Sequence, residues 1–220
     1  MTTKPTAFIF DLNGTMVDDM EFHGKAWSSI INDDLKAGLT YEEVKKQMYG
    51  KNSELLHRIF GDKRFTPEEE DKLSLEKEHR YQAAYRSSLS LIDGLDGFLE
   101  KAKAAGISMA IGSAAIPFNI NFVLDGLAIG HYFKAVVSAD DVQVSKPHPE
   151  TFLKAAELLG SAPENCVVFE DAPKGVEAAQ NAGMKCVVLT TMHGQEDFSS
   201  YTNVIAFIST YNDPALNQLF

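Results

Sequence analysis

The sequence predicts an α/β protein, with a Rossmann-like, doubly wound parallel sheet as its core and an all-α domain inserted into it. After residue 91, short apolar runs of strand length alternate with helical patterns, which is typical of parallel strands joined by helices. Residues 17–91, in contrast, show helical periodicity and no convincing strand. Because this helical stretch follows the first strand, we expect a core of residues 1–16 and 92–220 and a helical domain of residues 17–91.

The first elements follow from local signals. Residues 6–10 are apolar and flanked by turn residues, which predicts a short buried strand. An apolar stripe at helical spacing predicts a helix over residues 21–32. Thr40 and Thr66 each stand three residues before a glutamate, so each opens a capping box. The second box has a proline at the first helical position and predicts a long helix that reaches about Ser88.

The remaining chain alternates between the two element types. Strands are expected at residues 108–112, 135–138, 166–170, 185–189 and 204–208, and helices at 95–105, 117–127, 149–159 and 175–182. With the strand at residues 6–10, this makes a sheet of six strands, whose crossovers we expect to be right-handed.

Composition limits the classes of partner. The chain of 220 residues carries a net charge of −11, which argues against nucleic acid as a partner. Cys166 and Cys186 lie in apolar runs, which favours buried thiols in a reducing compartment. No signal-peptide pattern opens the chain, and no apolar run approaches the ~20 residues that span a bilayer. We therefore expect a cytoplasmic protein, monomeric and without a membrane partner.

The first strand ends in the segment Asp11-Leu12-Asn13-Gly14-Thr15. Open parallel sheets bind ligands at the carboxyl ends of their strands, which is where Asp11 falls and where Thr15 offers a hydroxyl. The segment resembles the Asp-x-Asp-Gly-Thr motif of the haloacid dehalogenase (HAD) superfamily. This resemblance implies that Asp11 is a nucleophile that becomes an aspartyl-phosphate. It also implies an acid/base at position 13, where Asn13 cannot exchange a proton near neutral pH.

Three later segments resemble the other motifs of this family, in the same order. Ser113 and Ala114 follow a strand, and the resemblance implies that they bind the transferring phosphoryl group. Lys146 lies in a stiff Lys-Pro-His-Pro loop and would neutralise the phosphate. Taken singly, Ser113 is also explained as a helix cap and Lys146 as a solvated loop residue.

Glu170 and Asp171 are adjacent acids that directly follow an apolar strand, where like charges repel unless a cation lies beside them. Paired acids of this kind can also cap a helix. The family uses these positions to bind Mg²⁺, which prefers oxygen ligands. The resemblance thus implies a site made of Asp11, Asp171, Glu170 and the main-chain carbonyl of Asn13.

The helical insertion resembles the cap of β-phosphoglucomutase-like proteins. The segment around His23, at residues 20–27, and the one around Lys77, at residues 76–81, match that cap. Lys51 and Asn52 fall in the loop that contacts the substrate in these relatives. The resemblance implies that all four residues bind substrate; the alternative is that His23 and Lys77 are solvated side chains on helix surfaces.

The function expected from this resemblance is Mg²⁺-dependent phosphoryl transfer from a small, sugar-phosphate-like metabolite. A mutase must hold a second phosphate, but Ala115, Ile116 and Pro117 follow Ser113 and cannot bind one. We therefore favour a phosphatase, with β-phosphoglucomutase as the alternative, and expect Asn13 to impair turnover in either. A non-catalytic protein that binds a phosphorylated metabolite is the third hypothesis.

Overall fold

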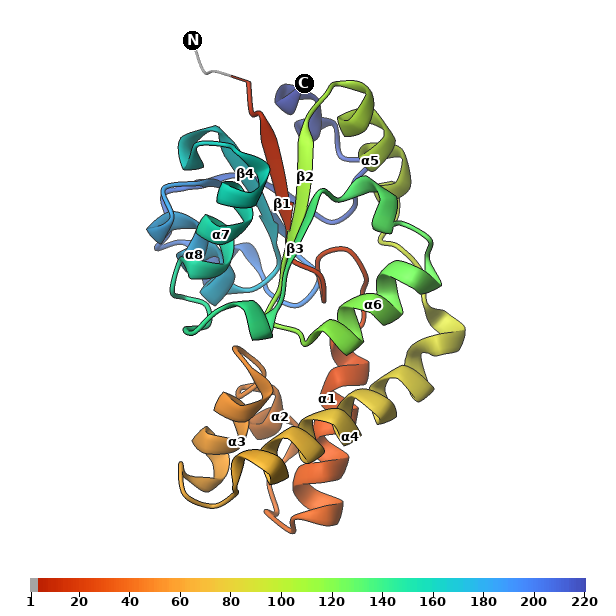
Figure 1. The fold of residues 1–220 in the computed structure, drawn as a ribbon, viewed down its shortest axis with the longest axis vertical. Helices are drawn as coiled ribbons and strands as arrows, with labels where there is room; N and C mark the ends of the chain where they lie inside the picture. Colours follow the sequence, from red (N-terminus) through yellow and green to blue (C-terminus); the bar gives the residue numbers. More distant parts are fainter. Residues whose placement is uncertain (1–3) are drawn as a thin grey trace. The chain divides into compact units, whose positions relative to one another are not determined.

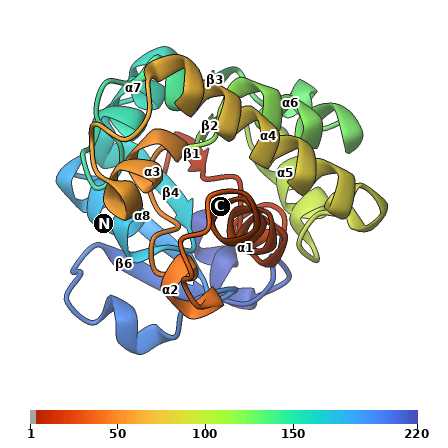
Figure 2. The same ribbon diagram turned by 90° about the horizontal axis from the view of Figure 1, so that it is seen from below.

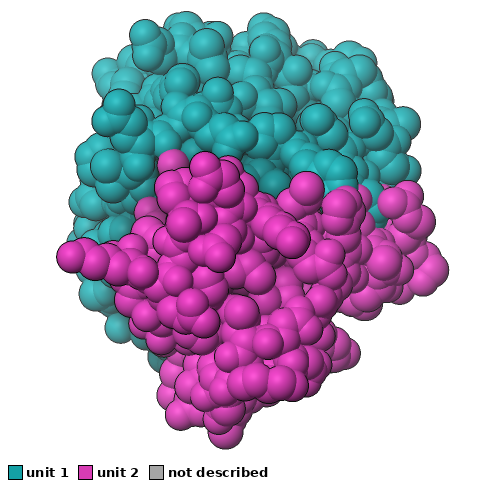
Figure 3. All heavy atoms as spheres, turned by 60° about the horizontal axis from the view of Figure 1, so that its bottom comes forward, with its two compact units in different colours: residues 1–18, 90–220 teal, residues 19–89 magenta. Residues whose placement is uncertain are grey.

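The computed structural model describes residues 4–220 and confirms the predicted α/β fold. The chain forms two compact units, coloured separately in Figure 3. Unit 1 comprises the chain up to Asp18 together with Ser90–Phe220, and unit 2 comprises Asp19–Leu89. That unit 1 is a catalytic core and unit 2 its cap stays a prediction. Among residues 4–220, no helix has the length and apolar character needed to cross a membrane.

Unit 1 contains a six-stranded sheet in which every pair of neighbouring strands is parallel, in the order β3-β2-β1-β4-β5-β6. The strands are β1 (Ala7–Phe10), β2 (Ser108–Gly112), β3 (Ala135–Val137), β4 (Cys166–Glu170), β5 (Lys185–Leu189) and β6 (Val204–Ile208). All six predicted strands form. β1 and β3 are each one residue shorter than predicted, and Ser138 instead caps a short 3₁₀ turn through its side chain.

Helices cover both faces of this sheet, with α7 and α8 on one face and α5 on the other (Figure 1). The helices of unit 1 are α5 (Leu95–Ala104), α6 (Pro117–Gly126), α7 (Glu150–Leu159) and α8 (Pro173–Asn181). The sequence placed the start of α8 two residues late. Pro173 occupies its first turn, where a proline lacks only an N–H that the helix would not use.

β1 is buried on both faces, because its alternate side chains pack under different helices. Ala7 and Ile9 join an apolar cluster that includes residues of α7 and α8. Phe8 and Phe10 point the other way and meet Phe98 of α5 at ring-centroid distances of 5.5 and 6.3 Å. This two-sided packing fixes β1 and, with it, the position of the residue that follows.

Both cysteines are buried free thiols, as predicted. Burial raises the pKa of the Cys166 thiol to about 11 and also raises that of Cys186. At neutral pH both therefore behave as small apolar core residues.

Unit 2 contains helices and no strand among its described residues (Figures 1 and 2). It has an apolar core of its own. Its elements are α1 (Met20–Ser28), a π-helical segment (Ser29–Asp34), α2 (Tyr41–Lys45), α3 (Asn52–Phe60), α4 (Pro67–Tyr85) and a 3₁₀ turn (Arg86–Ser88). Both predicted capping boxes are present, at Thr40 and Thr66.

The sequence did not delimit α3 and treated Lys51 and Asn52 as loop residues, which is wrong for Asn52 and holds for Lys51. Lys51 is the N-cap of α3 and Asn52 its first residue. Lys51 is not among the side chains that favour an N-cap, so the usual signal is missing. Instead, the Lys51 main-chain N–H donates to Oε2 of Glu54 over 3.0 Å. The side chain of a residue within α3 thus provides the hydrogen-bond partner of the N-cap N–H.

Candidate active site

The strand register brings three motifs to one edge of the sheet. Phe10, the last residue of β1, pairs with Ile111 of β2 on one side and with Phe169 of β4 on the other. The next residue, Asp11, donates its main-chain N–H to the Phe169 carbonyl over 2.9 Å. Glu170 therefore lies level with Asp11. The carboxyl ends of these three strands present their polar residues together, as expected for a parallel sheet.

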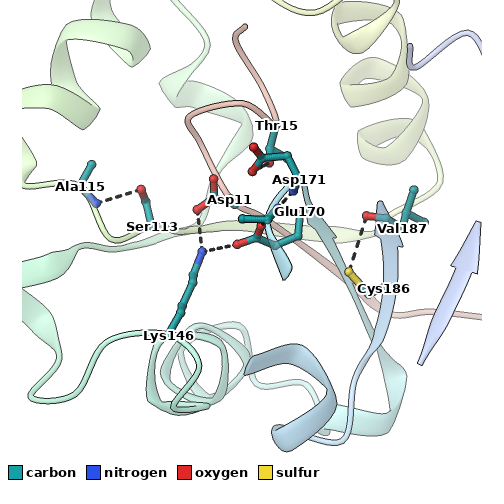
Figure 4. Close-up of polar contacts among 10 residues, drawn as sticks. Asp11, Thr15, Ser113, Ala115, Lys146, Glu170, Asp171, Cys186 and Val187 are labelled. Carbon is teal, nitrogen blue, oxygen red and sulfur yellow. Dashed lines mark hydrogen bonds and ion pairs between the residues drawn. The ribbon is translucent and has the colours of Figure 1, made fainter. Parts of the chain in front are cut away.

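Three carboxylates meet at this edge. One oxygen each from Asp11, Glu170 and Asp171 lies within 4.8 Å of the other two, and all three residues are buried (Figure 4). Burial, together with repulsion from Glu170 and Asp11, raises the pKa of Asp171 well above its usual range. An oxygen-only donor set of this kind suits Mg²⁺, and a divalent ion would relieve the repulsion.

Lys146 supplies the cationic group of this cluster. Its Nζ donates to Oδ1 of Asp11 over 2.6 Å and to Oε1 of Glu170 over 2.7 Å, and the side chain is buried (Figure 4). Burial alone would lower the pKa of Lys146, but the charges of Asp11 and Glu170 outweigh it and raise the pKa. Lys146 is thus a fixed positive charge. When all three carboxyl groups are ionised, Lys146 leaves an excess of two negative charges, which matches the charge of one divalent cation.

Both oxygens of the Glu170 carboxylate already contact protein donors. Oε1 accepts from Lys146, and Oε2 accepts from the main-chain N–H groups of Asp171 and Ala172 over 2.9 and 2.8 Å. Gly175 makes room for this carboxylate, because a Cβ on Gly175 would lie 1.7 Å from Oε1. This geometry is compatible with two roles for Glu170. The residue can hold Lys146 and Asp171 in place, and it can also bind a metal ion directly.

The turn after β1 contributes Asn13, Gly14 and Thr15. The Thr15 hydroxyl donates to Oδ1 of Asp171 over 3.2 Å, so Thr15 joins the acidic cluster directly. Gly14 has a φ of 76°, and a Cβ there would lie 2.2 Å from Oδ2 of Asp171. Only glycine fits this position. The half-buried Asn13 forms an isolated parallel bridge with Val17, which closes the turn.

The residues after β2 lie at the same edge. Ser113 follows β2 by one residue and is buried, and its Oγ accepts from the Ala115 main-chain N–H over 3.1 Å (Figure 4). Ala114, half-buried, stands between them. The alternative of Ser113 as a helix cap is wrong, because the N-cap of α6 is Ile116 and the Ser113 contact closes a local turn before it. The Ser113 hydroxyl still has a hydrogen to donate.

In unit 2, three of the four predicted substrate residues gather around a glutamate that the sequence did not single out. Lys77 Nζ donates to Nδ1 of His23 over 2.6 Å and to Oε1 of Glu78 over 2.9 Å. Asn52 Nδ2 donates to the same Glu78 oxygen over 3.1 Å. His23 and Lys77 are 5% and 4% exposed, so the interpretation of them as solvated helix residues is wrong. Lys51 stands one residue before Asn52, at the N-cap of α3.

The contacts of His23 define its tautomer. A lysine ammonium only donates hydrogen bonds, so Nδ1 accepts from Lys77 and the ring proton lies on Nε2. Nε2 faces Oδ2 of Asp19 at 3.4 Å, and that oxygen also accepts from the Tyr81 hydroxyl over 2.6 Å. The imidazole stacks on the Tyr81 ring with a centroid distance of 3.7 Å. His23 is therefore held in one orientation by contacts on both ring nitrogens and on the ring face.

Fold and site together define a class of protein: an α/β enzyme whose acidic cluster lies at the carboxyl edge of a parallel sheet. Residues 5–183 match the family model described as haloacid dehalogenase-like hydrolase, and the chain belongs to this family. The sequence-based assignment to this superfamily is confirmed.

Its relatives include enzymes that release phosphate and enzymes that move it. The chain is 31% identical to fructose-1-phosphate phosphatase YqaB of Escherichia coli over 85% of this chain and 97% of the relative. It is 33% identical to β-phosphoglucomutase of Bacillus subtilis, over 82% of this chain and 81% of the relative. Among solved structures, a family IA HAD hydrolase from Entamoeba histolytica matches with a TM-score of 0.86 and 25% identity, over 97% and 96% of the two chains.

Proposed function

We propose that this protein is a Mg²⁺-dependent phosphatase of a small, sugar-phosphate-like metabolite, and that it acts through an aspartyl-phosphate on Asp11. The supporting observation is the buried contact of Asp11 with Lys146 beside Asp171, at the edge where parallel sheets bind their ligands. The proposal also draws on the relatives, one of which is named for fructose 1-phosphate.

In this proposal an Asp11 carboxylate oxygen attacks phosphorus, and the bond from phosphorus to the metabolite oxygen breaks. The metabolite leaves as an alkoxide that takes up a proton from solvent water. Water then attacks the phosphorus of the aspartyl-phosphate, which releases inorganic phosphate and restores Asp11. Lys146 stabilises the charge on the phosphoryl oxygens, and Ser113 donates its remaining hydrogen to one of them.

Asp11, Asp171 and the Asn13 carbonyl would hold Mg²⁺, with Glu170 beside them. When bound, the ion supplies further positive charge to the phosphoryl oxygens. The excess negative charge of the cluster and the raised pKa of Asp171 support such an ion.

Asn13 lowers the rate in this proposal, because an amide neither protonates the leaving oxygen nor activates the attacking water. We expect Asn13→Asp to raise phosphate release by about 10²- to 10⁴-fold, the usual contribution of general acid/base catalysis. The measurement is phosphate release from a panel of phosphorylated metabolites with Mg²⁺. Asn217→Asp, an exposed position in unit 1, controls for the added charge.

Two results would contradict the proposal. If Asn13→Asp releases phosphate from no metabolite, the chain belongs to the class of non-catalytic binding proteins. If Asn13→Asp and the parent chain release phosphate at the same measurable rate, residue 13 has no acid/base role. Asp11→Asn in the Asn13→Asp background must abolish release.

A mutase is the second candidate, supported by the β-phosphoglucomutase relative. The residues after Ser113 argue against it, since Ala115, Ile116 and Pro117 offer no side-chain group for a second phosphate. The two reactions differ in product. Conversion of β-glucose 1-phosphate to glucose 6-phosphate by the Asn13→Asp chain, without phosphate release, would establish the mutase.

A further inference from the structure

The turn that follows β1 is held by two hydroxyl groups from the far end of the chain. The Thr191 hydroxyl donates to the Gly14 carbonyl over 2.6 Å. The Tyr211 hydroxyl donates to the Thr15 carbonyl over 3.0 Å, and Tyr211 is buried. Both bonds link residues more than 170 positions apart, so they are tertiary contacts and not part of the turn's own hydrogen bonding.

The two residues lie in the loops that follow β5 and β6. Thr191 follows β5 by two residues and Tyr211 follows β6 by three. β5 and β6 lie two and three places from β1 in the sheet order. The Tyr211 main-chain N–H also donates to the Asp93 carbonyl over 2.8 Å, which anchors Tyr211 itself. The loops after β5 and β6 therefore reach back to the turn that follows the candidate nucleophile Asp11.

The Thr191 bond fixes the peptide group after Gly14, and the Tyr211 bond fixes the one after Thr15. The peptide group before Gly14 is fixed within the turn that these two hydroxyls hold. The Gly14 N–H donates to the Val17 carbonyl over 2.8 Å, and because a peptide is planar this sets the direction of the Asn13 carbonyl. In the same way, the bond from Thr191 to the Gly14 carbonyl sets the plane that contains the Thr15 N–H. Gly14 is the most permissive residue in the turn, so external constraint matters most there.

We propose that Thr191 and Tyr211 are positioning residues for the metal site: they hold the turn so that the Asn13 carbonyl and the Thr15 hydroxyl face the acidic cluster before an ion binds. This inference rests on the proposed function, since it assumes that Mg²⁺ binds at Asp11 and Asp171. Partners that orient metal ligands typically change metal affinity by 10- to 100-fold when they are removed.

The test is Thr191→Val, which removes the hydroxyl but keeps the branched shape. Thr190→Val is the matched control. Thr190 is the neighbour of Thr191 and is also half-buried. Its hydroxyl donates to the Ile208 carbonyl over 3.3 Å, which lies outside the turn. Tyr211→Phe is the second variant. For each variant, Mg²⁺ affinity is measured by calorimetry and amide hydrogen exchange is measured at Gly14 and Met16.

We expect Thr191→Val and Tyr211→Phe to weaken Mg²⁺ binding by about 10- to 100-fold and to accelerate exchange at the turn, while Thr190→Val does neither. Exchange as slow as in the Thr190→Val control would show that the hydroxyls do not hold the turn. Faster exchange with unchanged Mg²⁺ affinity would show that they hold it without positioning the metal site. Both results overturn the inference.

A parent chain that binds no Mg²⁺ would contradict the proposed function and, with it, any role in positioning metal ligands. Exchange at Gly14 and Met16 would still decide, on its own, whether the two hydroxyls constrain the turn. The two failures are therefore distinguishable.

Discussion

Gly175 shapes the acidic cluster by lacking a side chain. It lies in α8 with helical geometry, so its backbone conformation needs no glycine. A Cβ there would lie 1.7 Å from Oε1 of Glu170, the oxygen that accepts from Lys146. The need for this glycine depends on where the Glu170 side chain points. Side-chain direction at a strand end is a tertiary property that no local pattern encodes.

Gly175→Ala therefore tests whether the Glu170 carboxylate is held in place. Alanine is the better helix former by about 1 kcal/mol, but the methyl group must displace Glu170, and overpacking typically costs about 1–3 kcal/mol. We expect a lower free energy of unfolding and weaker Mg²⁺ binding. Gly97→Ala is the control, because Gly97 is an exposed glycine of α5 with no atom within 4 Å of a built Cβ. A Gly175→Ala protein as stable as the Gly97→Ala protein would contradict this account.

At the scale of elements, α4 explains why the polar cluster of unit 2 was only partly predicted. The buried side of α4 is mostly polar, so it has no apolar stripe. The buried residues nevertheless keep helical spacing: Ser74, Lys77, Glu78, Tyr81, Gln82 and Tyr85. Lys77 was found only through a family resemblance. Glu78 is one acid among several in a charged segment, and the sequence offers no way to tell the buried one from the solvated ones.

Glu78→Gln tests the role of this buried charge in unit 2. Burial tends to raise the pKa of Glu78, but the nearby Lys77 and His23 outweigh it and lower the pKa. A lowered pKa stabilises the fold above the unfolded-state value of about 4.3 and loses this effect as pH falls through the folded-state value. We expect Glu78→Gln to cost about 3 kcal/mol at pH 7, and the cost to shrink below about pH 4.

The measurement is urea unfolding followed by fluorescence of Trp27, the chain's one tryptophan, which is buried in unit 2. Glu76→Gln is the matched control on the same helix, because Glu76 is half exposed and pairs with Arg80 at the surface. Its loss should cost about 0.5 kcal/mol or less. A cost for Glu78→Gln that does not vary with pH would rule out its charge as the cause.

At the scale of the whole molecule, the fold follows from the sequence more completely than the site does. The six strands could be predicted because each is a short apolar run between turn residues, and a parallel order brings their carboxyl ends together. The same argument predicted the approach of Asp11 to Asp171. It could not predict Thr191 and Tyr211, because neither lies in a motif and both act through single hydroxyl groups. Contacts of that kind depend on loop conformation, which strand patterns leave open.

The chain leaves unit 1 and returns to it at neighbouring residues, since the Ile92 N–H donates to the Met16 carbonyl over 2.9 Å. The apolar cluster under α7 and α8 is built only from residues of unit 1, and unit 2 has a separate core.

We therefore expect unit 1 to fold cooperatively when a short Gly/Ser linker replaces Asp19–Leu89. We also expect this shortened chain to keep the Mg²⁺ affinity of the parent, because the acidic cluster lies wholly in unit 1. With Asn13→Asp added, it should release phosphate from different metabolites at similar rates if Lys51, Asn52 and Lys77 bind substrate as predicted, since it lacks them. Calorimetry and a phosphate-release panel test both expectations. A shortened chain that folds but binds no Mg²⁺ would show that unit 2 supplies part of the metal site.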